Sequence, residues 1–213
     1  LGRIIDYLKK HGVTKVTAIG KVSKELLMNG RHELPDWRMV KLLLSLPDHK
    51  DDTLMLTFVA ALKKEGIELV DQTLLIRPLM PAAGTLTRRA PSENERRDMA
   101  FGFRMAKEIG RLDVGQTAVV KGMAVMALEA IEGTDACIRR GGALAGSGAV
   151  VAKAAKPQQD NRFDVPAVGL DTIESLVAAK ASALVMEAGK TLFIDRERAI
   201  ALAEANGITI AAM

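Results

Sequence analysis

Apolar residues recur at helical spacing at the start of the chain and then alternate with polar residues. Ile4, Ile5 and Leu8 fall on one face of a helix that His11–Gly12 would end, and the alternation over Val13–Ile19 predicts a strand. The pattern then predicts two amphipathic helices and a short strand, at 36–46, 51–64 and 67–70. The first part of the chain is therefore expected to be α/β.

Periodicity disappears between Pro78 and Pro91, where proline, glycine, threonine and arginine interrupt the apolar residues. Such a shift in composition is typical of a linker or a long functional loop. We therefore predict an N-terminal domain at 1–80, a linker at 81–91 and a C-terminal domain at 92–213.

The pattern of the second domain predicts mixed α/β structure. Ser92 and Glu95 have the spacing of a capping box, which would open a helix that ends near Ile109. Thr117–Val120 and Met123–Ala130 predict a hairpin around a Lys-Gly turn. The further expected elements are a short helix at 135–140, a strand at 148–154, a helix at 170–180, strands at 183–186 and 191–194, a helix at 196–205 and a strand at 208–211.

Composition narrows the class of protein. The 213 residues are 48% hydrophobic and 26% charged, which fits a globular protein with a sizeable core, and no apolar run approaches the ~20 residues that span a bilayer. A net charge of +4 and a pI near 9.2 favour an anionic partner. Aromatic residues are only 3%, too few for the stacking platforms of single-stranded nucleic-acid binders. A single cysteine excludes an internal disulfide and favours the cytoplasm.

Several local patterns resemble known motifs but lack a required residue or spacing. Gly189–Thr191 resembles the end of a phosphate-binding loop, but Leu184 stands where its first glycine would be, so a turn is predicted. A flexible connection explains the glycine-dense run 141–148 at least as well as a phosphate cradle does. The three histidines have no zinc-ligand spacing, and Cys137 is predicted to pack within a helix rather than act as a nucleophile.

A first group of acids and cations follows the predicted hairpin: Glu129, Glu132, Thr134, Asp135, Arg139 and Arg140. One interpretation is a helix N-terminus at which Thr134 or Asp135 caps backbone N–H groups. A helix N-terminus beside two arginines also suits a phosphate, because exposed N–H groups and the helix dipole attract negative charge. The two interpretations are compatible.

A second group follows a predicted strand: Lys153, Lys156, Asp160, Arg162 and Asp164. A solvated charged loop is the simplest interpretation. Carboxylates, however, suit a hard divalent cation, and ammonium and guanidinium groups suit a pyrophosphate, so Mg²⁺ with a diphosphate would satisfy the whole set. Phe163 and Pro166 would hold this turn against the core and fix the position of Asp164.

Four ordered blocks of the sequence resemble the LpxI-type UDP-2,3-diacylglucosamine pyrophosphatases of lipid A biosynthesis. The blocks are 113–121, 129–140, 156–169 and 187–191, and the resemblance extends over essentially the whole chain. It implies Mg²⁺-dependent hydrolysis of UDP-2,3-diacylglucosamine to UMP and 2,3-diacylglucosamine 1-phosphate (lipid X). It also implies an N-terminal nucleotide-side domain, a C-terminal lipid-phosphate-binding domain and catalysis between them. Family members usually begin with a further strand and a glycine-rich loop, so the N-terminal domain is expected to lack its start.

The resemblance also implies roles for individual residues. Asp164 is the first candidate for the catalytic, metal-binding carboxylate, and Asp160 is the second catalytic candidate. Glu132 and Asp135 are further metal candidates. The residues expected to bind substrate are Gln116, Thr134, Arg139, Lys156, Arg162 and Lys190.

Other function classes remain open from sequence. A non-catalytic module that binds a nucleotide sugar or a lipid phosphate would use the same anion site, and its binding would occur without Mg²⁺-stimulated release of UMP. A nucleic-acid binder is favoured only by the pI, and we expect no nucleic-acid partner. The resemblance implies a cytoplasmic protein that contacts the surface of the inner membrane peripherally, and a homo-oligomer is compatible with it.

Overall fold

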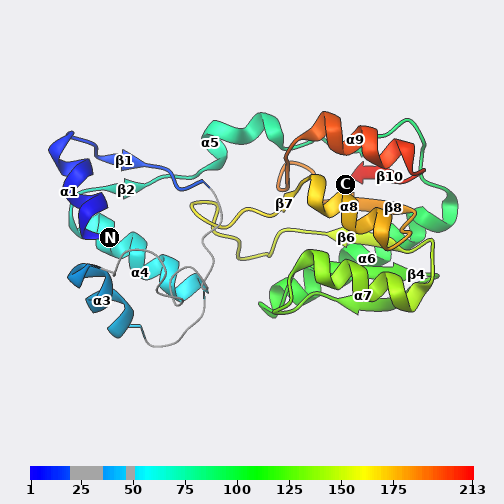
Figure 1. Ribbon diagram of the computed structural model, residues 1–213, viewed down its shortest axis with the longest axis horizontal. Helices are drawn as coiled ribbons and strands as arrows, with labels where there is room; N and C mark the ends of the chain where they lie inside the picture. Colours follow the sequence, from blue (N-terminus) through cyan, green and yellow to red (C-terminus); the bar gives the residue numbers. More distant parts are fainter. Residues whose placement is uncertain (20–35, 47–50) are drawn as a thin grey trace. The chain divides into compact units, whose positions relative to one another are not determined.

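The structure, a computed structural model, describes residues 1–19, 36–46 and 51–213, which divide into two compact units (Figure 1). Unit 1 comprises Leu1–Leu74 and Asn161–Phe163, and unit 2 comprises Leu75–Asp160 and Asp164–Met213. Each unit combines helices with a sheet, which confirms the prediction of a two-domain α/β protein.

Unit 1 is a small α/β unit. Its elements are α1 (Gly2–Lys10), β1 (Lys15–Val16), α3 (Trp37–Leu44), α4 (Asp51–Lys64) and β2 (Glu68–Leu69). The two short strands pair in parallel, and the core between them and the helices contains Ile5, Leu62 and Ile67. Phe163 packs against this core, and the N–H of Gln72 donates to the carbonyl of Asn161 at 3.1 Å. A short segment from far along the sequence is therefore part of this unit.

The segment 81–91, for which the sequence predicts a linker, is built into unit 2. It follows α5 (Thr73–Ile76) and the 3₁₀ turn η1 (Arg77–Leu79), and it contains β3 (Gly84–Thr85). This strand pairs with the last strand of the chain, and the hydroxyl of Thr87 accepts from the N–H of Ile210 at 3.1 Å. Composition could not reveal this pairing, because the partner strand is more than a hundred residues away.

The main sheet of unit 2 has six strands in the order β3-β10-β8-β6-β4-β5. The strands not yet given are β4 (Thr117–Lys121), β5 (Ala124–Leu128), β6 (Val150–Lys153), β8 (Ala183–Met186) and β10 (Thr209–Ala212). Strands β6, β8 and β10 are parallel, and β4 and β5 form the predicted antiparallel hairpin. A separate parallel pair joins β7 (Ala167–Val168) to β9 (Leu192–Phe193).

Helices cover both faces of this sheet (Figure 1). They are α6 (Glu93–Arg111) on one face, and α7 (Thr134–Ala145), α8 (Leu170–Ala178) and α9 (Arg196–Ala205) on the other. The alternation of β4 shows why: Val119 packs in the core beneath α7, whereas Ala118 and Val120 pack in the core beneath α6. The predicted capping box of Ser92 and Glu95 is present at the start of α6.

The glycine-dense run 141–148 is not simply a flexible connection, because α7 continues through its first half to Ala145. A Cβ atom added to Gly141 would lie 2.5 Å from Cβ of Val119, and one added to Gly142 would overlap Cβ of Ala179. These glycines therefore let α7 approach the sheet and α8 closely. Cys137 is buried in the same helix, as predicted.

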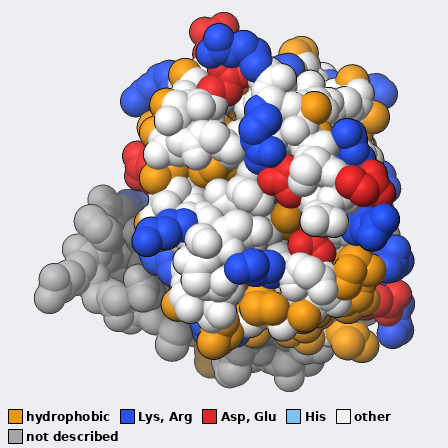
Figure 2. Space-filling model, turned by 90° about the vertical axis from the view of Figure 1, so that its right-hand side faces the viewer, with side chains coloured by type: hydrophobic (Ala, Val, Ile, Leu, Met, Phe, Trp, Pro, Cys, Tyr) orange, Lys and Arg blue, Asp and Glu red, His pale blue; other side chains and the backbone are white. Residues whose placement is uncertain are grey.

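The surface of the face shown in Figure 2 carries basic side chains interspersed with acidic ones and with scattered hydrophobic side chains. No helix among the described ranges is long and apolar enough to cross a bilayer.

Candidate functional site

The chemically distinctive residues of unit 2 lie at one end of its main sheet. Here the parallel strands β6, β8 and β10 finish, the antiparallel strand β4 begins, and Thr117 pairs with Lys153. We call this region the carboxyl end of the sheet. In open α/β sheets, ligands bind in the crevice outside the carboxyl ends of parallel strands.

A buried polar network joins β6, α7, β7 and the end of β5 at the carboxyl end. The ammonium of Lys153 donates to the hydroxyl of Thr134 at 2.9 Å and to the carbonyl of Ala167 at 2.7 Å. The hydroxyl of Thr134 lies 3.1 Å from Oε1 of Glu129, to which it donates, and Oε2 of Glu129 accepts from the N–H of Gln116. Lys153 and Glu129 are both buried. Because each bonds to Thr134, they link the ends of β6 and β5 to the start of α7.

The role of Thr134 as a helix cap, which the sequence allowed, is wrong. The N-cap residue of α7 is Gly133, with φ of 80°, and no side chain caps the helix. Thr134 is the first helical residue, and its hydroxyl is used by Lys153 and Glu129 instead. The residue is therefore part of a tertiary network.

Buried polar atoms without a hydrogen-bond partner also gather at this end. Among the described residues of unit 2 they are Gln116 Oε1, Asp135 Oδ1, Gln159 Nε2 and Thr191 Oγ1. These residues immediately precede β4, begin α7, follow β6 and follow β8. Buried polar groups in folded proteins are nearly always hydrogen-bonded, so such a concentration favours a ligand site.

Glu187, at the end of β8, is the centre of a second network. Its Oε2 accepts from Lys107 on α6 at 3.0 Å and from the N–H of Ala155 at 2.8 Å, while Oε1 accepts from Lys190 at 3.0 Å. Burial by itself would raise the pKa of Glu187, but hydrogen bonds from Lys190 and Lys107 outweigh it and lower the pKa below its usual value. The carboxylate therefore stays ionised although it is buried.

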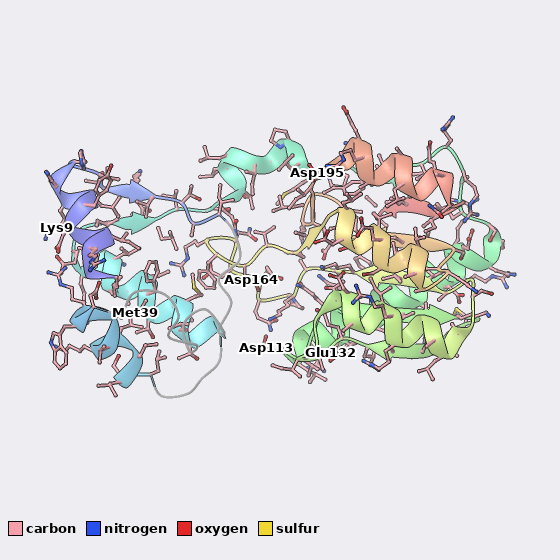
Figure 3. The ribbon with its side chains drawn as sticks, viewed as in Figure 1. Lys9, Met39, Asp113, Glu132, Asp164 and Asp195 are labelled. Carbon is pink, nitrogen blue, oxygen red and sulfur yellow. The ribbon has the colours of Figure 1, made fainter. Side chains whose placement is uncertain are left out.

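The segment after β6 carries the main catalytic candidates. Lys156 donates to Asp113 at 2.7 Å, and its backbone N–H donates to the side chain of Gln159 at 2.8 Å. The N–H of Asp164 donates to the carbonyl of Asp160 at 2.9 Å, which closes a turn that contains both acids. Figure 3 shows Asp113, Glu132 and Asp164 at the same end of unit 2.

The candidate metal ligands Asp164, Glu132 and Asp135 are not brought together as one cluster. Within the described ranges, no group of three or more His, Cys, Asp or Glu residues is arranged to hold a metal ion. Glu132 instead pairs with Arg140, whose hydrogen bond lowers the pKa of that carboxyl. Among the described candidate carboxylates, Asp160 and Asp164 lie in one backbone turn. Two carboxylates together with substrate phosphates are a common arrangement for Mg²⁺ in proteins.

The remaining candidates are held by different partners. Arg139 on α7 donates to the hydroxyl of Ser175 on α8 at 3.2 Å, and Lys190 binds Glu187. Arg162 belongs to unit 1, where its guanidinium lies 5.9 Å from the ring centre of Phe163. Phe163 packs in the core of unit 1 whereas Pro166 is buried in unit 2, so the two anchors predicted for this turn belong to different units.

Sequence reasoning missed Lys107 and Glu187 as members of the site. Lys107 lies within an amphipathic helix, where a charged residue is ordinarily solvent-exposed. Glu187 directly follows a predicted strand and begins the block 187–191 of the family resemblance, but the sequence assigned it no role. An acid that directly follows a fully apolar strand was the signal available, since parallel strands bring such positions to one end.

A cavity of about 470 Å³ lies away from these residues. It is lined by the first turns of α6 and by the β4–β5 turn, including Asp98, Lys121 and Met123. Asp98 accepts hydrogen bonds from the N–H groups of Gly122 and Met123, so this carboxylate holds the hairpin turn. The cavity contains none of the candidate site residues.

Two family models match the chain. The LpxI N-terminal domain matches residues 1–79 and the LpxI C-terminal domain matches residues 82–211. The UDP-2,3-diacylglucosamine pyrophosphatase LpxI of Caulobacter vibrioides is 35% identical over 220 residues, an alignment that covers 98% of this chain and 78% of that protein.

Proposed function

The chain belongs to the LpxI family, and on that basis we propose that it hydrolyses the pyrophosphate bond of UDP-2,3-diacylglucosamine. The products are UMP and 2,3-diacylglucosamine 1-phosphate (lipid X), within lipid A biosynthesis. The observation that carries the proposal is the 35% identity to a pyrophosphatase of this name, which extends through both family domains.

The carboxyl end of the sheet supports this proposal chemically. Lysines and carboxylates lie there beside buried polar atoms that have no partner in the described residues. Hydrolysis of a pyrophosphate requires cations that neutralise the phosphate oxygens and a group that orients the attacking water. The candidate residues supply both.

In the proposed reaction, a bond forms between the oxygen of water and one phosphorus, and the P–O bond to the bridging oxygen breaks. Asp164 orients the water, and Asp160 lies in the same backbone turn. Lys156, Lys190 and Arg139 of unit 2 bind the phosphates, while Gln116 and Thr134 contact the substrate. Water loses its proton to solvent, and the bridging oxygen leaves as part of a phosphate group.

Mg²⁺ fits the hard oxygen donors of Asp164 and Asp160 better than the wider set that includes Glu132 and Asp135. Mg²⁺ commonly binds one or two carboxylates together with substrate phosphates, so a cage of protein ligands is not required. When bound, the ion supplies charge neutralisation and a lower pKa for a coordinated water.

The lipid substrate leads us to propose peripheral contact with the inner-membrane surface from the cytoplasmic side. Leu112 and Val114 flank Asp113 and are exposed, and Ile131, next to Glu132, is fully exposed. Gly115 packs against the backbone of Glu129, which keeps these segments adjacent. Replacing Ile131 with Ser should weaken sedimentation with anionic phospholipid vesicles, whereas Leu144→Ser, at an exposed position late in α7, should not.

The direct test is release of UMP from UDP-2,3-diacylglucosamine by the purified chain. We expect Mg²⁺-stimulated release, loss of release with EDTA and recovery when Mg²⁺ is restored in excess. The melting temperature should change little with EDTA, because the ion depends on the substrate phosphates for binding. Binding of the substrate without release of UMP would favour the non-catalytic module instead.

Asp164→Ala tests the central residue. We expect at least a hundredfold loss of kcat, with substrate still bound. Glu93→Ala is the matched control, because Glu93 is an exposed carboxylate that pairs with Arg97 at the start of α6. Near-normal hydrolysis by Asp164→Ala would reject the assignment of Asp164 without rejecting the pyrophosphatase activity.

A further inference from the structure

Glu187 connects three parts of unit 2 that carry or adjoin the candidate site. Its Oε2 binds the N–H of Ala155, the second residue after β6, and the ammonium of Lys107 on α6. Its Oε1 binds Lys190, a candidate phosphate ligand. One carboxylate thus fixes the first residues of the segment that leads to Asp160 and Asp164.

The backbone strengthens this connection. The N–H of Glu187 donates to the carbonyl of Lys153 at 3.1 Å, which extends the pairing of β8 with β6 by one residue. Lys107 also donates to the carbonyl of Ala155 at 2.8 Å, so Ala155 is held through both of its backbone polar groups. Thr191, whose buried hydroxyl has no partner, donates its N–H to the carbonyl of Glu187.

We propose that Glu187 is a positioning residue for the pyrophosphatase reaction: it orients Lys190 toward the substrate phosphates and holds the start of the segment that carries Asp160 and Asp164. The ammonium group of Lys107 neutralises part of the negative charge of Glu187. This inference rests on the proposed function and adds to it a residue that does not itself contact the substrate.

Two substitutions of Glu187, one that changes its charge and one that changes its length, distinguish a positioning role from a packing role. Glu187→Gln keeps the side-chain length and one acceptor oxygen for Ala155, but the neutral amide binds two ammonium groups less well. Glu187→Asp keeps the charge but is one methylene shorter. A positioning role that depends on charge therefore places the kcat of Glu187→Asp above that of Glu187→Gln, whereas a packing role gives the reverse order.

Glu95 provides a matched control in the same unit. The side chains of Glu95 and Glu187 are each 11% exposed, and each carboxylate pairs with a cation. Glu95 lies on α6 twelve residues before Lys107, which corresponds to roughly 18 Å along the helix. Glu95→Gln should lower stability without lowering kcat of the folded protein.

The experiment measures kcat and KM for release of UMP, at a temperature where every variant is folded. We expect Glu187→Gln to lower kcat/KM at least tenfold and Glu95→Gln to leave it within twofold. Because Glu187 acts through Lys190, Lys190→Ala should cost less in the Glu187→Gln background than in the wild type. Amide exchange should be faster by about tenfold at Ala155 and Lys156 in Glu187→Gln but not in Glu95→Gln.

The outcomes separate this inference from the function on which it rests. A wild-type chain that releases no UMP rejects the proposed function. A wild-type chain that is active, with Glu187→Gln equal to Glu95→Gln in kcat/KM, rejects the positioning role alone. Additive effects of the Glu187 and Lys190 substitutions, or unchanged exchange at Ala155, would also overturn it.

Discussion

Lys153 and Thr134 are nineteen positions apart, yet the ammonium of Lys153 donates to the hydroxyl of Thr134 at 2.9 Å. The same hydroxyl donates to Glu129, so a buried cation and a buried acid are joined through one threonine. The link ties the end of β6 to the start of α7. It thereby fixes one side of the carboxyl end of the sheet.

Replacement of Thr134 by Val should lower the stability of the protein, because it removes this link. Valine has a similar shape but leaves Lys153 and Glu129 each without one hydrogen bond, so we expect the free energy of unfolding to fall by about 1–3 kcal/mol. Urea denaturation would measure the change. Thr134→Ser retains the hydroxyl and should stay within about 0.5 kcal/mol of the wild type. Equal stability of the Val and Ser variants would contradict the network.

Gly141→Ala should destabilise the protein although alanine favours helices. The added Cβ would lie 2.5 Å from Cβ of Val119, and overpacking of this kind costs about 1–3 kcal/mol. The better helix propensity of alanine offsets about 1 kcal/mol of that cost. We therefore expect a lower melting temperature. Leu144→Ala on the same helix, where the side chain is 67% exposed, should change it little.

The stability of unit 2 should depend on pH through Glu95. Burial raises the pKa of this carboxyl, but hydrogen bonds from Arg89 and the N–H of Ser92 outweigh burial and bring the pKa to about 2, from an ordinary 4.5. A group with a lowered folded pKa stabilises above its unfolded pKa, and this stabilisation is lost as pH falls through the folded pKa.

We therefore expect the wild type to exceed Glu95→Gln in free energy of unfolding by up to about 3 kcal/mol at pH 6–8. The difference should shrink between pH 4.5 and about 2. Urea titrations of both proteins across this range would measure it. A difference that does not change with pH would show that the charge of Glu95 contributes nothing.

Cys137 should be unreactive in the native protein. Burial, followed by the nearby charge of Glu129, raises the pKa of this thiol to about 12, and the thiolate is the reactive form. Iodoacetamide at pH 8 should label the protein in denaturant but not in buffer, as measured by intact mass. Rapid labelling of the folded protein would contradict the burial of α7 against the sheet.

Much of the local structure could be predicted from the sequence. The capping box of Ser92 and Glu95, the β4–β5 hairpin and the helix at 196–205 each depend on neighbours within a few residues, and all are present. Prediction from neighbouring residues fails where contacts with distant residues determine the secondary structure. The run 141–148 has poor helix propensity, but packing of Gly141 on Val119 extends α7 into it.

The candidate site divides in the same way. The sequence by itself determined which segments carry acids and cations, and it contained the ordered blocks of the LpxI family. The tertiary structure alone decided that Glu132 pairs with Arg140, that Thr134 joins Lys153 to Glu129, and that Glu187 links Lys107, Lys190 and Ala155. The physical reason is that Thr134 and Lys153, and Glu187 with Lys107 and Ala155, lie on separate elements that meet where the parallel strands end at one side of the sheet. Strand order depends on contacts between residues far apart in the sequence. Glu132 and Arg140 are closer in sequence, but their pairing depends on how the chain turns between β5 and α7.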